Sequence, residues 1–222
     1  MINYSENNII TLIGTIVSER AFSHEVYGEG FYSFDIEVPR LSENSDIIPV
    51  TVSERILTDE FRVGQKVVID GQFRSYNNYE NEKNKLVLTV FVKDIRLQDE
   101  NTDLSNPNEI CLAGFICKKP IYRTTPFGRE IADVLLAVNR AYNKSDYIPC
   151  IAWGRNARYC QNIAIGERVK IWGRIQSRQY EKKFEDGTVE IRKAYEVSVS
   201  KMEIEKNEED TENNSSIEEQ NV

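Results

Sequence analysis

Short apolar runs that alternate with polar residues recur along the chain, bounded by Gly, Pro, Asn and Asp. In the second half they predict strands at 109–117, 131–139, 146–153 and 167–177, and a hairpin joining 180–184 to 189–200 across Glu185-Asp186-Gly187. In the first half they predict strands at 9–17, 31–39, 47–52, 66–73 and 86–97. Short helices are expected at 156–162 and near 53–61. Three strands, a helix and two more strands is the order of an OB-fold, a five-stranded barrel. The pattern therefore predicts an all-β protein with two such barrels in tandem.

An internal repeat with a period near 100 residues supports two copies of one domain. Three pairs of segments match in the same order: Leu12-Ile13-Gly14 with Leu112-Ala113-Gly114, Asp46-Ile47-Ile48-Pro49 with Asp146-Tyr147-Ile148-Pro149, and Gly71-Gln72-Phe73-Arg74-Ser75 with Gly173-Arg174-Ile175-Gln176-Ser177. Several matches at almost constant spacing indicate duplication of one folding unit.

Charge is distributed unevenly between the two copies. The whole chain carries −8, with 10 Lys and Arg against 18 Asp and Glu in residues 1–104, 17 against 11 in 105–204, and 1 against 7 in 205–222. We therefore predict an acidic barrel at 1–100, a linker at 101–107, a basic barrel at 108–204 and an acidic, disordered tail at 205–222. A basic block between acidic ones indicates a polyanionic partner.

The strand at 147–153 carries the first candidate chemistry. Side chains alternate along a strand, so Ile148, Cys150 and Ala152 should face the barrel interior, while Tyr147 and Trp153 should lie on the opposite face. Exposed rings of this kind stack on nucleic-acid bases, although the same rings could also belong to a core.

Cations interleaved with further aromatics surround this strand in the predicted fold. Such a mixture is typical of a groove that follows phosphates and stacks bases. With Tyr147 and Trp153, the candidate binding residues are Arg123, Arg140, Tyr142, Arg155, Arg174, Arg178, Tyr180, Lys182, Lys183 and Arg192. Trp172 could contact nucleic acid or lie in a subunit interface, and the sequence leaves both open.

Several motifs of the second copy resemble the bacterial single-stranded DNA-binding protein family. They are Gly114-Phe115, the stretch 120–128, Ala137-Val138-Asn139-Arg140, the stretch 146–154 and the stretch 173–178. The resemblance is close over about 108–204 and faint over 8–98. It implies sequence-independent binding and protection of single-stranded DNA during replication, repair or recombination. By this resemblance Tyr142, Tyr147, Trp153 and Tyr180 stack on bases, and the position of Arg123 is basic.

The chain departs from this family in two respects. Family members usually carry one barrel and form tetramers, so two barrels in one chain imply a homodimer that presents four. The family's acidic tail typically ends in a Pro-Phe tip that recruits replication and repair proteins, whereas this chain ends in Gln220-Asn221-Val222. Recruitment of such partners by the tail stays open.

The first copy lacks part of the candidate site. Val52-Ser53-Glu54-Arg55 stands where the second copy has Ala152-Trp153-Gly154-Arg155, so one ring is lost. Because the copy is also acidic, we expect it to serve assembly, with weak or no DNA contact. Residues Phe22, Tyr27, Phe31 and Tyr32 could still form a residual stacking surface.

Other function classes are less well supported. A primosome-type accessory protein that binds single strands secondarily is the alternative, and single-stranded RNA is a third possibility. No phosphate-binding loop or clustered carboxylate motif is present, and the one histidine, His24, lies outside the basic half, so we expect no enzyme and no cofactor. Four cysteines without a CxxC pair predict reduced thiols and no metal site. No export signal or long apolar run is found, so the expected location is the cytoplasm.

Overall fold

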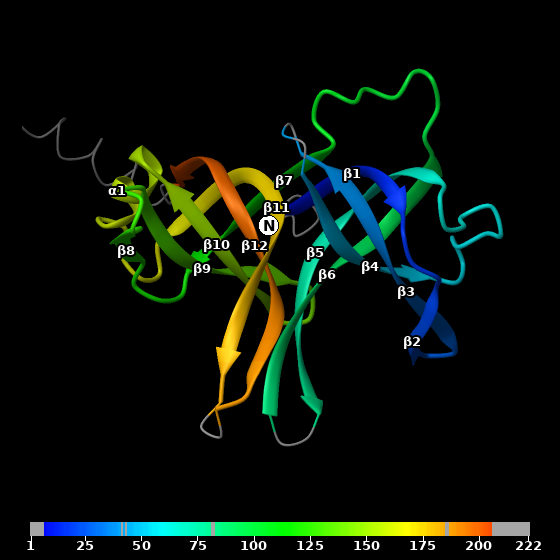
Figure 1. Ribbon diagram of the computed structural model, residues 1–222, viewed down its shortest axis with the longest axis horizontal. Coiled ribbons are helices and arrows are strands. Elements are labelled where there is room, and N and C mark those ends of the chain that lie inside the picture. The colour runs from blue at the N-terminus through cyan, green and yellow to red at the C-terminus, as the bar shows by residue number, and fades with distance from the viewer. Residues whose placement is uncertain (1–6, 41, 43, 81–82, 185–186, 206–222) are drawn as a thin grey trace, which may run out of the picture.

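The computed structural model describes residues 7–40, 42, 44–80, 83–184 and 187–205. Its elements, in chain order, are β1 (Asn8–Ile16), β2 (Ala21–Val26), β3 (Glu29–Pro39), β4 (Ser45–Ser53), β5 (Lys66–Glu80), β6 (Lys83–Leu97), β7 (Asn108–Ile116), β8 (Ile121–Thr124), β9 (Glu130–Arg140), β10 (Lys144–Trp153), α1 (Arg155–Cys160), β11 (Arg168–Lys183) and β12 (Val189–Ile204). The fold is all-β, with two OB-fold barrels in tandem (Figure 1). In the part of the chain that these ranges cover, no helix is long and apolar enough to span a membrane.

Each barrel closes on itself, and the two share one continuous sheet. The strand order is β2-β3-β4-β6-β5-β1-β7-β11-β12-β10-β9-β8, with β1–β3 and β7–β9 as the closing pairings. Both closures pass over a glycine. A Cβ on Gly14 would meet the carbonyl oxygen of Glu37, and one on Gly114 would meet that of Ala137. Barrel closure at these points therefore requires a residue without a side chain, which explains why the repeat keeps both glycines.

Antiparallel pairing of β1 with β7 joins the barrels. Ile10 lies opposite Ile110, its equivalent in the repeat, so a pseudo-twofold axis passes between them. Two asparagines beside the axis make the same pair of hydrogen bonds, one asparagine in each barrel. Asn8 bonds both the backbone NH and the carbonyl of Phe73, and Asn108 does the same for Ile175. The two repeats are therefore joined much as two subunits of a symmetric dimer would be.

Two buried aspartates link each barrel to the other. Asp46 accepts hydrogen bonds from Arg40 of its own barrel at 2.6 and 2.7 Å, and from the backbone NH of Ser177 in the other barrel at 2.8 Å. Asp146 accepts the backbone NH of Ser75 in the first barrel at 2.8 Å. Both carboxyl groups have no exposed side-chain surface. Because the hydrogen bonds from Ser177 and Ser75 cross the seam, they hold the barrels in a fixed relative orientation.

Apolar side chains fill both barrels. Phe73, Ile36 and Ile69 are fully buried in the first, and Leu136, Ile148 and Ile175 in the second. On β3, β9, β10 and β11 these residues alternate with partly exposed neighbours, as the sequence pattern predicted. On β5, Val68 and Gln72 beside Ile69 and Phe73 are buried as well.

The prediction of a helix near 53–61 was wrong, because this segment forms turns in the structure. The Ser53 side chain accepts the backbone NH of Arg55, and the Thr58 hydroxyl bonds Glu60. Side-chain bonds of this kind compete with helix formation, and they hold the segment in successive turns. The only helix among the described residues is α1, in the second barrel.

Strand lengths also differ from expectation. Each barrel has an extra short strand, β2 or β8, that the pattern did not predict. Strand β11 runs without interruption to Lys183, whereas the sequence suggested a break before Tyr180. The predicted turn residues Glu185 and Asp186 and nearly all of the predicted tail, 206–222, lie outside the described residues.

Candidate nucleic-acid interface

The face predicted on β10 is present and accessible. Ile148 and Ala152 have no exposed surface and Cys150 only 3%, whereas Tyr147 is 48% and Trp153 36% exposed. The Trp153 indole NH donates to the Ser198 hydroxyl on β12 at 3.1 Å, which orients the ring while part of it stays exposed. Ile151, on the same side of the strand as the two rings, is buried.

Two further rings lie at either end of this barrel. Tyr142 sits in the β9–β10 turn with φ of 60° and is 94% exposed. Tyr180 lies on β11, opposite Arg192 of β12, and is 39% exposed. All four predicted aromatic residues are therefore accessible at their surfaces, as base stacking requires.

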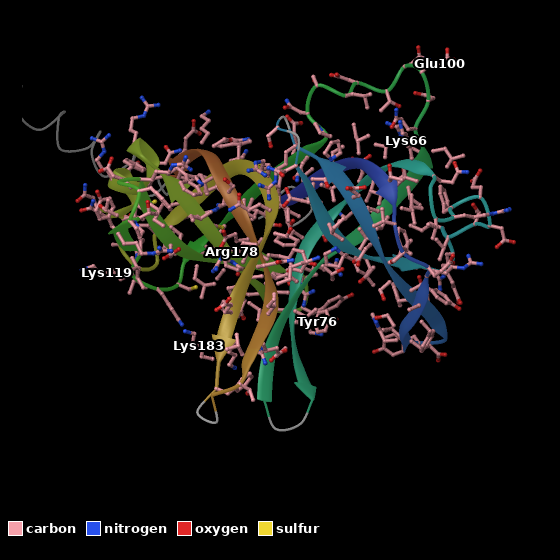
Figure 2. All side chains as sticks on the ribbon, in the orientation of Figure 1. Lys66, Tyr76, Glu100, Lys119, Arg178 and Lys183 are labelled. Atoms are coloured by element: carbon pink, nitrogen blue, oxygen red, sulfur yellow. The ribbon has the colours of Figure 1, made fainter. Side chains whose placement is uncertain are left out.

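The long hairpin of the second barrel lies beside that of the first, so Tyr180 has neighbours that the sequence did not indicate (Figure 2). Tyr180 and Arg192 line a groove of about 720 Å³ together with Tyr76 and Leu86 of the first barrel. Tyr76 is 51% exposed. The groove thus combines aromatic surface from both repeats.

Most of the predicted arginines pair with carboxylates. Arg123 bonds Asp133 on β9 at 2.8 Å, Arg178 contacts Glu196 at 3.2 Å, and Arg192 contacts Glu190 at 2.7 Å. These pairs reduce the positive potential of the face. An exposed pair such as Arg123–Asp133 contributes only about 0–1 kcal/mol, so a phosphate can compete for this guanidinium group, whereas the Glu196 partner of Arg178 is buried.

Three predicted cations have no carboxylate partner within the described ranges. Arg155 and Lys183 are exposed, and the Lys182 ammonium lies 5.2 Å from the Phe184 ring. Arg123 lies on the short strand β8.

Two predicted cations face the seam between barrels. Arg174 lines a cavity of about 310 Å³ with Arg40 and contacts Asp46 at 3.3 Å. Arg140 lies 3.4 Å from Asp146 and lines a different cavity, of about 830 Å³. Arg174 therefore makes an ion pair across the seam with the first barrel.

An additional exposed ring was missed from the sequence. Phe127 is 92% exposed at the tip of the β8–β9 turn, and Tyr27 is 103% exposed at the tip of the β2–β3 turn. Gly28 and Gly128 follow them with φ of 79° and 75°. Tyr27 was among the predicted rings, and the 100-residue spacing between these aromatic–glycine pairs was the signal that could have identified Phe127 as well.

Trp172 lies on the outer face of the seam. Its cross-strand neighbour on β7 is Cys111, which in turn lies opposite Ile9 on β1. The Lys201 ammonium lies 4.5 Å from the Trp172 ring centre. Ile9 is 47% exposed. The residues of this row lie on β1, β7 and β11, and none of them is on β10.

The chain has two tandem OB-folds with exposed aromatic rings beside cations. These features place it in the class of OB-fold proteins whose surface suits a nucleic acid. The sequence profile of the single-strand binding protein family matches residues 107–205. Single-stranded DNA-binding protein B of Bacillus subtilis is 38% identical over 84 residues, which cover 33% of this chain and 72% of that protein. This chain belongs to the single-strand binding protein family.

Other similarities define the extent of this relationship. Single-stranded DNA-binding protein 1 of Staphylococcus aureus is 38% identical over 81 residues, 33% of this chain, and the match spans 48% of that protein. The wild-type single-stranded DNA binding protein from Thermus aquaticus has a similar fold over 90% of this chain and 93% of its own, with a TM-score of 0.72 and 18% identity. The sequence similarity thus covers the second barrel, and the structural similarity covers both. These relatives are named as DNA-binding proteins and not as enzymes.

Proposed function

We propose that this chain binds single-stranded DNA without sequence preference and protects it during replication, repair or recombination. The observation that carries the proposal is the set of exposed rings, Tyr142, Tyr147 and Trp153, along β10 and the turn before it. Any base can stack on such a ring, and each stack contributes about 1–3 kcal/mol. The names of the similar proteins support the same ligand.

Binding in this proposal is stoichiometric and not catalytic. Phosphates displace counterions at Arg155, Lys182 and Lys183, and they compete with carboxylates for Arg123, Arg178 and Arg192. We place the protein in the cytoplasm, where unwound DNA is exposed.

Single-tryptophan variants test the proposal directly. Trp172→Phe leaves Trp153 as the sole tryptophan, and Trp153→Phe leaves Trp172. Titration with oligo-dT should quench Trp153 strongly and Trp172 much less, because only Trp153 lies on the stacking face. A duplex of equal length and oligo-U are the controls for strandedness and sugar. Absence of saturable oligo-dT binding by the wild type would reject the proposed function.

We also propose that the divisions at 101–107 and near 205 separate two barrels and a tail, and that two chains form a dimer with four barrels. The row Ile9–Cys111–Trp172 supports a subunit contact, because it presents apolar surface on the outer face of the shared sheet. Sedimentation equilibrium of the wild type and of Ile9→Glu tests it. A wild-type monomer, or an unchanged dimer of Ile9→Glu, would contradict this arrangement.

A further inference from the structure

The seam between the barrels has two sides related by the pseudo-twofold axis, and they differ in charge balance. Each side has a buried aspartate at its centre, Asp46 on one and Asp146 on the other. Each aspartate has an arginine beside it: Arg40 directly follows β3, and Arg140 is the last residue of β9. The repeat makes these positions equivalent. Differences between the two sides therefore reflect changes in the residues around them.

On the Asp46 side the charges are matched. Arg40 binds Asp46 through two hydrogen bonds, Arg174 adds a third contact at 3.3 Å, and Ser177 donates its backbone NH. Although burial acts to raise it, the hydrogen bonds from Arg40 and Ser177 hold the pKa of Asp46 below its ordinary value. The cavity on this side is small, about 310 Å³.

On the Asp146 side the charges are more loosely matched. The Arg140 Nε and the Asp146 Oδ2 are buried and lie 3.4 Å apart as an ion pair without a hydrogen bond, and the buried Arg74 Nε has no hydrogen-bond partner among the described residues. Burial raises the pKa of Asp146, and burial together with the charge of Arg140 lowers the pKa of Arg74. Buried polar groups without partners are rare in proteins, so the Arg74 Nε and the loose pair beside it favour an additional ligand on this side.

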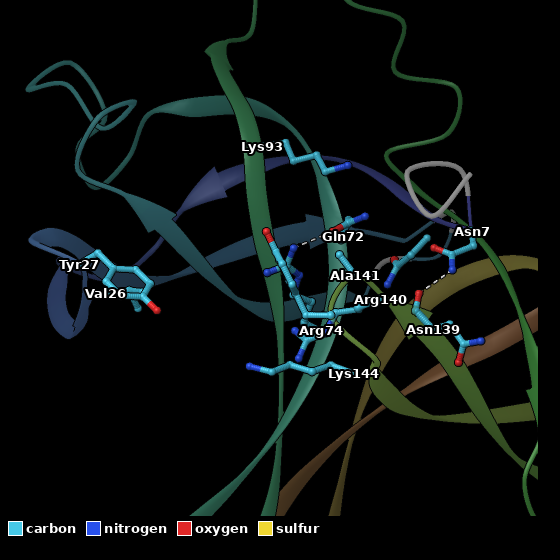
Figure 3. A pocket seen from close by; sticks show the side chains of 12 residues that line it. Asn7, Val26, Tyr27, Gln72, Arg74, Lys93, Asn139, Arg140, Ala141 and Lys144 are labelled. Carbon is cyan, nitrogen blue, oxygen red and sulfur yellow. Dashed lines mark hydrogen bonds between the residues drawn. The ribbon is translucent and has the colours of Figure 1, made fainter. Parts of the chain in front are cut away.

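The cavity on this side is suited to an anion. It measures about 830 Å³ and is lined by four cations, Arg74 and Lys93 from the first barrel and Arg140 and Lys144 from the second (Figure 3). No carboxylate is among the described residues that line it, and Lys93 and Lys144 are exposed. Behind this lining the buried carboxylate of Asp146 interacts with Arg140 and Arg74. It leaves Lys93 and Lys144 without an opposing charge among the described residues of the cavity.

Two exposed rings stand at the same cavity. Tyr142 from the second barrel and Tyr27 from the first both line it, and both have positive φ values, 60° and 51°. Cations that can follow a backbone and aromatic rings that can hold bases are the combination that a single strand requires. A small free anion would need the cations alone.

We propose that this inter-barrel groove holds the backbone of the bound single strand, which crosses here from the second barrel onto the first. The strand leaves Tyr142, passes Arg140, Arg74 and Lys93, and reaches Tyr27. The first barrel is then part of the binding path, in contrast to the role in assembly expected from its acidic sequence. This inference rests on the proposed function and extends it.

Lys93→Gln is the deciding variant, and Lys66→Gln is its matched control. Both lysines are exposed and lie in the first barrel, on the adjacent strands β6 and β5, but only Lys93 lines the groove. Loss of one phosphate contact should reduce the slope of log affinity against log salt by about 0.7. If the variant and the wild type bind equally at 1 M salt, this change in slope predicts that Lys93→Gln binds oligo-dT roughly 5-fold more weakly than the wild type at 0.1 M salt. Lys66→Gln should match the wild type.

A second variant guards against an effect on folding. Lys93→Arg keeps the charge and should restore wild-type affinity and salt slope, which a structural role of the lysine would not explain. If Lys93→Gln and Lys66→Gln bind like the wild type, the crossing is refuted while DNA binding by the second barrel stands. Loss of affinity without a change in salt slope would also refute it. Failure of the wild type to bind oligo-dT rejects the proposed function itself.

Discussion

The two buried aspartates give a paired test of what holds the barrels together. Asp46→Asn keeps the shape of the side chain and an oxygen for the backbone NH of Ser177, but it removes the charge that binds Arg40 and Arg174. Breaking a buried ion pair typically costs about 3–5 kcal/mol. Arg40 is 28% and Arg174 37% exposed, so water recovers part of this cost, and we expect about 2–4 kcal/mol.

Asp146→Asn should cost much less. The new amide oxygen can still accept the backbone NH of Ser75, and the only ion pair lost is the 3.4 Å contact with Arg140. The wild-type carboxylate is desolvated and its Oδ2 has no hydrogen-bond partner in the described part of the chain. Neutralising it therefore removes the desolvation penalty of the charge as well as its attraction to Arg140. We expect about 1 kcal/mol or less.

Urea unfolding, followed by tryptophan fluorescence and circular dichroism, measures both changes. A loss of about 3 kcal/mol corresponds to a fall in Tm of roughly 6–12 °C for a chain of this size. Equal destabilisation by the two substitutions would refute the reasoning, and so would an Asp46→Asn variant as stable as the wild type.

The pH dependence gives an independent check. Because the folded-state pKa of Asp46 is lowered, its contribution is present above the unfolded value near 3.8 and is lost as pH falls through the folded pKa. The difference between wild type and Asp46→Asn should therefore shrink in acid. For Asp146, whose folded-state pKa is raised, the wild type should gain stability relative to Asp146→Asn as pH falls through that raised value.

Three further predictions concern DNA binding. Trp153→Ala should weaken oligo-dT binding by about 1–3 kcal/mol in a fluorescence anisotropy titration. Its far-ultraviolet circular dichroism should be unchanged, and unaltered affinity would argue against stacking on this ring. Glu196→Gln should strengthen binding several-fold at low salt, because it removes the carboxylate that contacts Arg178; weaker binding by a folded variant would contradict that role. Deleting residues 206–222 should raise affinity at low salt if the acidic tail competes for the basic face, and unchanged or weaker binding would count against such competition.

The amino-acid sequence determined the repeat, the all-β class and the accessible side of β10, because these follow from local patterns. Alternation along a strand decides which residues share a face, so Tyr147 and Trp153 could be assigned to one surface without coordinates. Matching segments 100 residues apart carry the duplication by themselves.

Only the tertiary structure decided which charges are matched. Arg174 was predicted as a binding residue, but the pairing of β1 with β7 brings it to Asp46, 128 positions away in sequence. Lys93 belongs to an acidic segment, and its place in a cationic groove depends on the apposition of the two barrels. Electrostatic balance depends on distances through space, and these depend on long-range strand pairing that local patterns do not specify.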